Sequence, residues 1–336
     1  MAINAIGDMA QSFLLRRQTV QARQEIGLLT QELTTGRSSN PFQSVAGDYA
    51  YLADIERSLT LLSGYRTAAA EAEAFTNGMQ AALTSVQNIT EAFGAKLFET
   101  ASSDLASVRQ LTPRMAADTL QQVVNALNST VAGRSLFSGR DTNQPALADM
   151  SVILADLKST IPVPVTANDL RHAVDQWFDS PGSGFATSGY LGASTGPEAY
   201  RLGKGSELAL DLRADSPILR DVIKELAMTV LASDPALGFS DSDKSRLWRD
   251  SATGLATAQA GLTGLRADLG YAQERIENSK ARLAGERSSL EIARNNLLSV
   301  DPYEAATRLQ EAQNRLESIY TVTVRLSRLS LSEFMR

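Results

Sequence analysis

Residues 262–297 read LTGLRADLGYAQERIENSKARLAGERSSLEIARNNL, and this stretch decides the fold. Its repeat positions follow one another at alternating steps of three and four: Leu262, Leu265, Leu269, Ala272, Ile276, Ser279, Leu283, Glu286, Leu290, Ala293 and Leu297. This spacing is the a/d repeat of a coiled coil, although Ser279 and Glu286 make the seam imperfect. A helix that starts near Asp241 would contain about 59 residues and measure roughly 90 Å, which is longer than a compact domain of this size needs.

Similar stripes occur at both ends of the chain. The first contains Leu15, Thr19, Ala22, Ile26, Leu29 and Leu33, and it stops at Thr35-Gly36-Arg37, before Asn40-Pro41. The second contains Ala305, Leu309, Ala312, Leu316, Ile319, Thr323 and Leu326. It follows Asp301-Pro302, which predicts an N-cap and a first helical residue, with Glu304 placed to complete a capping box.

Short helices of this kind are stable only when their apolar stripes are buried. We therefore expect the two ends to pair with each other, either within one chain or as part of a larger assembly. Their positive and negative charges nearly cancel, which would allow close stacking of many copies. The expected assembly interface consists of Leu15, Ala22, Ile26, Leu29, Leu33, Leu309, Leu316, Ile319 and Leu326.

The middle of the chain has a different composition, with most of the prolines and many Gly-Ser-Thr clusters between Gly139 and about Ser240. We predict helices there over 145–159, 166–178 and 217–231, and strands near 185–190, 199–202 and 207–213. Two further helices are predicted, one beginning around Ser44 and continuing through Phe93, and one over 104–131. The fold class is mainly α: a long coiled-coil-like helical bundle built from both chain ends, with a small α+β domain inserted in the middle.

This pattern predicts three domains. Residues 1–40 with 295–336 form a pair of terminal helices, residues 41–140 with 241–294 form a helical rod, and residues 141–240 form the inserted domain. Three local patterns allow two interpretations each. Asp241-Ser242-Asp243 is favoured as a helix N-cap over a calcium loop, and Trp177-Phe178 as core over a partner-binding patch. Gly261, Gly264 and Gly270 indicate either close helix packing or a helix break.

The composition excludes many enzyme classes. The 336 residues contain no cysteine and one histidine, so disulfide scaffolds, thiolate zinc sites and multi-histidine metal centres are ruled out. His172 lies near Asp169 and Asp175, but without a Gly-x-Ser-x-Gly motif it is favoured as a surface or cap residue over the base of a hydrolase. Gly203-Lys204-Gly205-Ser206 lacks the spacing of a phosphate loop. We predict that the protein is not an enzyme and needs no cofactor or metal.

The charge and the hydropathy limit the partners. A net charge of -6 with no basic stripe indicates no nucleic-acid partner. The sequence contains no run of 18 or more apolar residues, so no membrane span is predicted. Residues 1–17 (MAINAIGDMAQSFLLRR) lack the features of a cleaved signal peptide. We therefore expect a soluble protein that would leave the cell, if it does, without a cleaved signal.

Three stretches resemble one known family. Thr35-Gly36-Arg37 with Asn40-Pro41 is similar to a Gly-x-Arg-Ile-Asn-x-Pro turn, and residues 132–142 (AGRSLFSGRDT) are similar to a Gly-Arg-Tyr-Leu-Phe-Ser/Ala-Gly stretch. Residues 329–336 (LSLSEFMR) resemble the family's last helix. The family is that of bacterial flagellar axial proteins, in particular the hook–filament junction proteins (hook-associated protein 3), which are relatives of flagellin. The resemblance covers about residues 10–140 and 241–336, and it departs at 42–45 (FQSV) and at Ser135, where the family has Ser-Asp-Asp-Pro and tyrosine.

The resemblance implies a structural role in the bacterial flagellum. Such proteins are exported unfolded through the flagellar type III apparatus. The resemblance implies that residues 1–40 with 295–336 are inner-core helices that order on assembly outside the cell, and that residues 141–240 point outward. A junction protein forms a ring-like layer of its own copies on hook-associated protein 1, receives flagellin on top, and adapts a bending hook to a stiffer filament. An export chaperone is a further implied partner. The alternatives are a flagellin that forms the filament itself and a cytoplasmic coiled-coil adaptor.

Overall fold

The computed structural model describes residues 2–40, 49–102, 106–163 and 165–334 and is mainly helical, as predicted. The helices are α1 (Ala2–Thr35), α3 (Tyr49–Ala101), α4 (Ala106–Leu127), α5 (Met150–Ser159), α6 (Ala167–Asp179), α7 (Pro217–Ala232), α8 (Asp241–Leu298) and α9 (Pro302–Phe334). Short strands form two antiparallel hairpins, β1 (Thr130–Val131) with β2 (Arg134–Ser135) and β3 (Tyr200–Gly203) with β4 (Ser206–Leu208).

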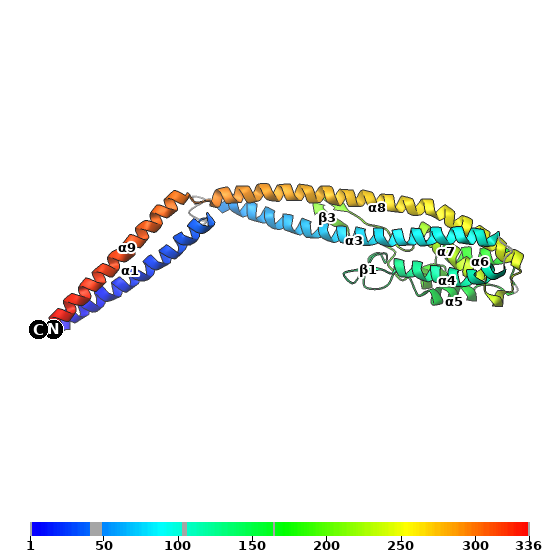
Figure 1. Cartoon of the computed structure of the whole chain (residues 1–336), viewed down its shortest axis with the longest axis horizontal. Helices are drawn as coiled ribbons and strands as arrows, with labels where there is room; N and C mark the ends of the chain where they lie inside the picture. The colour runs from blue at the N-terminus through cyan, green and yellow to red at the C-terminus, as the bar shows by residue number, and fades with distance from the viewer. Residues whose placement is uncertain (1, 41–48, 103–105, 164, 335–336) are drawn as a thin grey trace. The chain divides into compact units, whose positions relative to one another are not determined.

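The chain divides into two compact units. The first contains Met1–Ser63 and Ala284–Arg336, and the second contains Gly64–Leu283. Figure 1 shows α1 beside α9 in the first unit, and α3 and α8 as the two longest helices. These boundaries fall inside α3 and α8, whereas the sequence placed its boundaries at residues 40, 140, 240 and 294. The three-domain division therefore stays a prediction.

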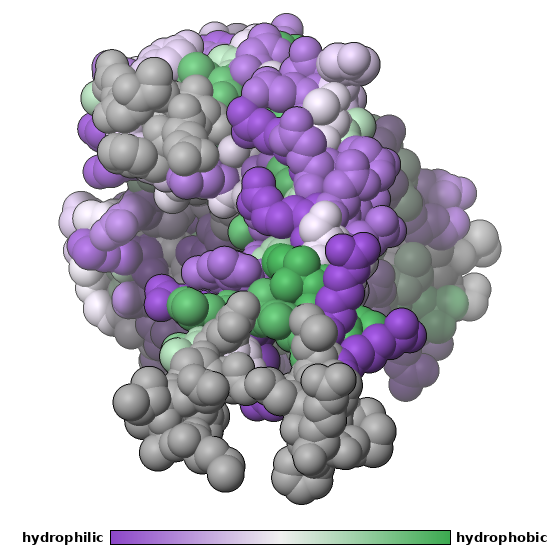
Figure 2. Space-filling view, turned by 90° about the vertical axis from the view of Figure 1, so that its left-hand side faces the viewer, coloured by the Kyte–Doolittle hydropathy of each residue, from purple (hydrophilic) through white to green (hydrophobic). Residues whose placement is uncertain are grey.

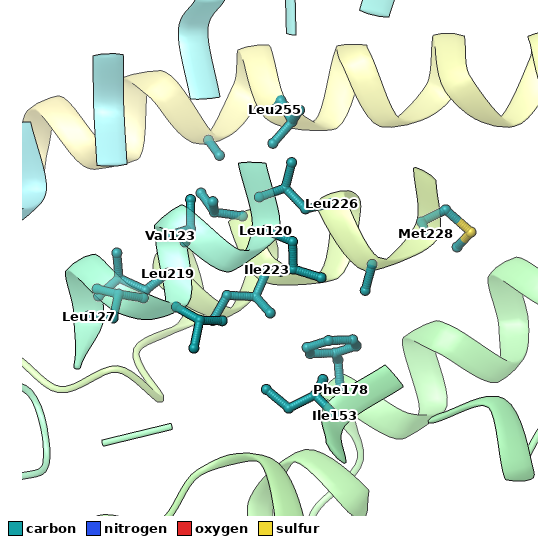
Figure 3. Packing of buried hydrophobic residues seen from close by; sticks show 14 of the residues in the cluster. Leu120, Val123, Leu127, Ile153, Phe178, Leu219, Ile223, Leu226, Met228 and Leu255 are labelled. Atoms are coloured by element: carbon teal, nitrogen blue, oxygen red, sulfur yellow. The ribbon is translucent and has the colours of Figure 1, made fainter. Parts of the chain in front are cut away.

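The larger of two hydrophobic clusters in the second unit includes residues from the helices of the middle region. Leu120 and Val123 of α4 face Leu219, Ile223 and Leu226 of α7, as Figure 3 shows. Ile153 of α5, Phe178 of α6 and Leu255 of α8 belong to the same cluster. Burial of large aliphatic and aromatic side chains is the main driving force for this packing. In this structure, α5, α6 and α7 share a core with α4 and α8.

A smaller cluster places the β3–β4 hairpin on the two long helices. The cluster contains four residues of the hairpin region and two from each long helix: Tyr200, Leu202, Leu208 and Leu210 with Ala69 and Ala72 of α3 and Ala272 and Ile276 of α8. The Ser279 Oγ atom donates a hydrogen bond to the Leu202 carbonyl over 2.5 Å and is itself buried. The polar residue that made the α8 seam imperfect is therefore a hydrogen-bonding contact to the hairpin. Glu286, the other polar seam residue, is exposed.

Several predicted elements are confirmed. Helix α8 begins at Asp241, where a start was predicted, but the N-cap is Ser240 and not a residue of Asp241-Ser242-Asp243. The Ser240 Oγ atom accepts a 3.2 Å hydrogen bond from the Asp243 backbone N–H. Helix α6 begins with a capping box between Thr166 and Asp169. The start of the predicted helix near Ser44 lies outside the described residues, and α3 is described from Tyr49.

Four predictions about the backbone are wrong. The helix predicted over 145–159 begins only at Met150, after the N-cap residue Asp149. The helix predicted to reach residue 131 ends at Leu127, because Ala132 and Gly133 both have positive φ and close the β1–β2 hairpin. The strand predicted over 185–190 is a π-helical turn at Phe185–Gly189. Of the strand predicted over 207–213, only Glu207 and Leu208 pair with β3, as part of β4 (Ser206–Leu208).

The glycines near residue 185 serve packing rather than strand formation. A Cβ atom on Gly184 would lie 1.8 Å from Trp177 Nε1, and one on Gly189 would lie 3.1 Å from the same indole ring. Trp177 and Phe178 are buried, so the prediction that they are core residues is confirmed. Polar contacts also hold this turn, since Trp177 Nε1 and Ser188 Oγ both donate to Asp156 Oδ2.

The glycines of α8 differ from one another. A Cβ atom on Gly261 would lie 2.9 Å from Ile218 Cγ1, so this glycine permits close packing of α8 on α7. Gly264 and Gly270 have open space where a Cβ atom would be, and the helix continues through both of them.

Two residue patterns that were weighed as catalytic or phosphate-binding sites lie in ordinary elements. His172 is exposed on α6, and Lys204 and Gly205 form the turn between β3 and β4.

Candidate assembly interface in the terminal helices

The two ends of the chain form an antiparallel helix pair, which we call the terminal helix pair (α1 and α9; Figure 1). An Arg23 Nη atom donates to Tyr320 Oη over 2.6 Å, and Arg315 forms a 3.2 Å ion pair with Glu25. This register places Ala22 level with Ile319. The repeats of three and four then bring the two predicted stripes together along the length of both helices.

The predicted interface residues lie mostly in the seam of this pair. Ala22, Leu29 and Ile319 are buried, and Leu15, Ile26, Leu309, Leu316 and Leu326 are half-buried. Leu33 is 39% exposed, because it lies in the last turn of α1, next to the point at which the helix ends. Of the two pairings that the sequence left open, the structure shows pairing within one chain.

The end of α1 is attached to the segment between α8 and α9, and we call these contacts the clasp (residues 36–38 with 298–300). Gly36 has a φ of +68°, and its N–H donates to the Glu32 carbonyl, as in an αL helix end. The Ser38 N–H donates to the Leu298 carbonyl over 2.9 Å, and the Val300 N–H donates to the Gly36 carbonyl over 3.1 Å. The Thr35-Gly36-Arg37 turn therefore joins the two chain ends. Pro41 and residues 42–45 lie outside the described residues.

Side chains strengthen the clasp at both helix ends. The Glu32 carboxylate accepts from the Ser39 N–H over 2.7 Å and from Ser39 Oγ over 2.6 Å, and Arg37 donates to Asn295 Oδ1. Helix α9 starts with Asp301 Oδ1 accepting from the Tyr303 N–H over 2.8 Å, which confirms the predicted N-cap. Glu304 pairs with Arg308 along the helix, where the sequence predicted a capping box.

Helix α1 also has a second apolar face, which was not predicted from the sequence. Phe13, Val20 and Leu28 are separated by seven and eight residues, so they share one face, roughly opposite to Ala22 and Leu29. Their exposed fractions are 68%, 54% and 50%. We call them the outer face. Their spacing was readable in the sequence, but it is shorter and less regular than the a/d stripe beside it.

Exposed apolar side chains are concentrated in the first unit. Of the twenty exposed large hydrophobic residues among the described side chains, thirteen lie in this unit, which contains about a third of the chain. Figure 2, which faces the end of the molecule on the left of Figure 1, shows hydrophobic surface gathered there beside hydrophilic surface. Exposed apolar patches of this kind are typical of surfaces that bind other proteins.

The second matched stretch, residues 132–142, is structural and lies in the second unit. Leu136, Phe137 and Ser138 are buried, and the Phe137 carbonyl accepts from the Ala214 N–H over 3.0 Å. Gly139 has a φ of +66°, and a Cβ atom there would lie 2.5 Å from the Thr195 carbonyl oxygen. This stretch therefore needs a glycine where the family motif has one.

The described residues show no sign of metal chemistry or of a membrane helix. They contain no group of three or more His, Asp or Glu side chains placed to hold a metal ion. Within the same ranges, none of the helices combines the length and the apolar character that crossing a membrane requires.

Comparisons with known proteins found one similarity to the C-terminal helices and one to the fold. Residues 253–335 match the model of the bacterial flagellin C-terminal helical region, so this part of the chain is similar to the C-terminal helices of flagellins. The fold is similar to a solved structure provisionally identified as a flagellar hook-associated protein from Vibrio parahaemolyticus. That similarity has a TM-score of 0.51 and 13% identity, and it covers 73% of this chain and 95% of the other. No curated protein matches.

The match at residues 253–335 agrees with the resemblance to flagellar axial proteins that the sequence shows at its C-terminal end.

Proposed function

We propose, from the flagellin C-terminal region in residues 253–335 and from the terminal helix pair, that this chain is a structural protein of the bacterial flagellum. Within the flagellum we assign it to the junction between hook and filament, where it forms a layer that adapts one to the other. The observation that carries the proposal is the pairing of the two chain ends through the stripe of Ala22, Leu29 and Ile319.

The terminal helix pair has the properties that an assembly element needs. Two helices can bury one seam between them, and the outer face of α1 remains exposed. Contact with another chain would remove those three side chains from water, and such burial is favourable by roughly 25 cal/mol per Å² of apolar surface. The occupants that fit a ring-like layer are other copies of this chain.

The junction role implies further partners and a location. Hook-associated protein 1 would lie below the layer, flagellin would lie above it, and an export chaperone would hold the chain before export. The protein would act outside the cell after passing through the type III apparatus unfolded. The similarity to the Vibrio parahaemolyticus structure supports a hook-associated protein over a filament flagellin.

Electron microscopy of a strain that lacks the gene tests the assignment. Loss of a junction protein should leave hooks without filaments and release flagellin monomers into the medium. Filaments that only shorten or change shape would instead indicate a flagellin. Normal flagella and normal swimming would exclude both roles and favour a cytoplasmic adaptor.

Limited proteolysis of the purified monomer gives a second test. If the terminal helices order on assembly, residues 1–40 and 295–336 should be digested first, while the core of the second unit stays intact. Ends that resist digestion in dilute monomer would contradict ordering on assembly.

A further inference from the structure

Helices α3 and α8 run from the second unit into the first, and each contains a glycine near the boundary. These residues are Gly64 and Gly285, and both are exposed in the helix interior. A Cβ atom on either glycine would meet no atom within 4 Å. Neither glycine is therefore explained by close packing or by a positive φ, although glycine weakens a helix interior relative to alanine.

Two ion pairs show that the glycines lie at a similar level on the two antiparallel helices. Lys280 pairs with Glu73 over 2.8 Å, and Arg294 pairs with Glu56 over 3.4 Å. Counting along both helices from these pairs puts Gly64 level with residues 286–289. Gly285 is thus within about one helical turn of the level of Gly64.

The other glycines of α3 differ from Gly64. A Cβ atom on Gly78 would lie 2.7 Å from Val131, and one on Gly94 would lie 3.6 Å from Leu255. Gly264 and Gly270 of α8 are also open, but no open glycine of α3 lies level with them. Among the described residues, Gly64 and Gly285 therefore mark the level at which α3 and α8 both have a glycine that packing does not require.

Two local features weaken the backbone at this level further. Ser63 directly precedes Gly64, and a Gly/Ser pair is one of the recurrent sites of helix kinks. The Gly285 carbonyl accepts a 3.1 Å hydrogen bond from Ser289 Oγ, a type of side-chain bond that often bends a helix. Leu283, two residues before Gly285, is the last buried residue of α8. Beyond it, Leu290 and Leu297 are half-buried.

We propose that Gly64 and Gly285 form a paired glycine hinge, at which α3 and α8 bend together without unfolding. The hinge is argued from the two helices alone and does not depend on the junction assignment. In an adaptor between two mechanically different structures, it would let the two units change orientation while each keeps its own packing.

The absence of cysteine permits a direct test by site-directed spin labelling. Labels go on Lys204→Cys, in the β3–β4 turn, and on Ile292→Cys, which is 58% exposed on α8. Pulsed electron paramagnetic resonance then measures the width of the distance distribution in three purified full-length backgrounds. These are the natural sequence, Gly64→Ala with Gly285→Ala, and Gly264→Ala with Gly270→Ala as the matched control.

The hinge predicts that only the Gly64/Gly285 variant narrows the distribution. Hydrogen exchange monitors folding, and backbone amides beside each alanine should exchange about fivefold more slowly in both variants, because alanine stabilises a helix relative to glycine. An unchanged width in the Gly64/Gly285 variant, or equal narrowing in the control, would overturn the hinge. Neither outcome bears on the gene-deletion result that tests the junction role.

Discussion

Truncation of the outer face of α1 should prevent efficient incorporation into the flagellum while leaving the chain folded. The variant is Phe13→Ala, Val20→Ala and Leu28→Ala. Alanine favours helix more than any of these residues does, and none of the three lies in the buried seam of the terminal helix pair. Folding of the second unit should be unaffected, because its core contains no residue of α1.

The expected magnitude follows from the exposed fractions, which are 68%, 54% and 50%. Full burial of such a side chain contributes about 1.5–3 kcal/mol, so the exposed portions together have about 2–3 kcal/mol left to gain after the alanine methyl groups are discounted. A difference of this size corresponds to an affinity loss of about 30- to 150-fold.

Competition within one cell measures this loss. Natural and variant chains with different tags are expressed at equal levels, and their ratio is determined in purified flagella. The control variant, Gln24→Ala with Gln31→Ala, lies on the same exposed side of α1 and should compete equally. Equal incorporation of the outer-face variant would refute the claim that this face is buried in the assembly.

Three further predictions concern the two units separately. Leu316→Asp with Ile319→Asp should abolish incorporation but leave the second unit folded, as circular dichroism and electron microscopy would show; normal swimming would contradict this. Burial raises the pKa of Glu225, so the carboxyl should keep its proton to higher pH in the folded chain. The free energy of unfolding should then fall as the pH rises above about 4.5, and Glu225→Gln should lack that decline in denaturant titrations. Gly261→Ala, which would crowd Ile218, should be at least about 1 kcal/mol less stable than Gly264→Ala, which enters open space; equal melting would contradict the packing account.

The parts of the fold that periodicity controls could be predicted from the sequence. The a/d repeat identified α8 and the seam of the terminal helix pair, and capping residues such as Thr166 and Asp301 marked where helices begin. Those signals are local: they come from residues that are close in the sequence, and they do not depend on what the helix packs against.

The parts that depend on tertiary contacts could not be predicted. The segment around Gly184 and Gly189 looked like a strand, because the sequence does not show that the chain turns back there to pack both glycines against the Trp177 ring. Ala132 adopts a positive φ that residue preference disfavours, so the β1–β2 hairpin was missed. At the interface, a weaker second periodicity beside the main stripe concealed the outer face of α1.

Disulfide trapping in assembled flagella tests the central claim most directly, because the chain has no cysteine of its own. Ala22→Cys with Ile319→Cys puts one thiol on each helix at the same level of the seam, whereas Ala22→Cys with Leu326→Cys puts them two turns apart on the same stripes. Mild oxidation of purified flagella should cross-link the first variant within one chain and leave the second as thiols. Absence of that cross-link in chains that have been incorporated, or equal cross-linking of both variants, would contradict pairing of the two chain ends in the flagellum.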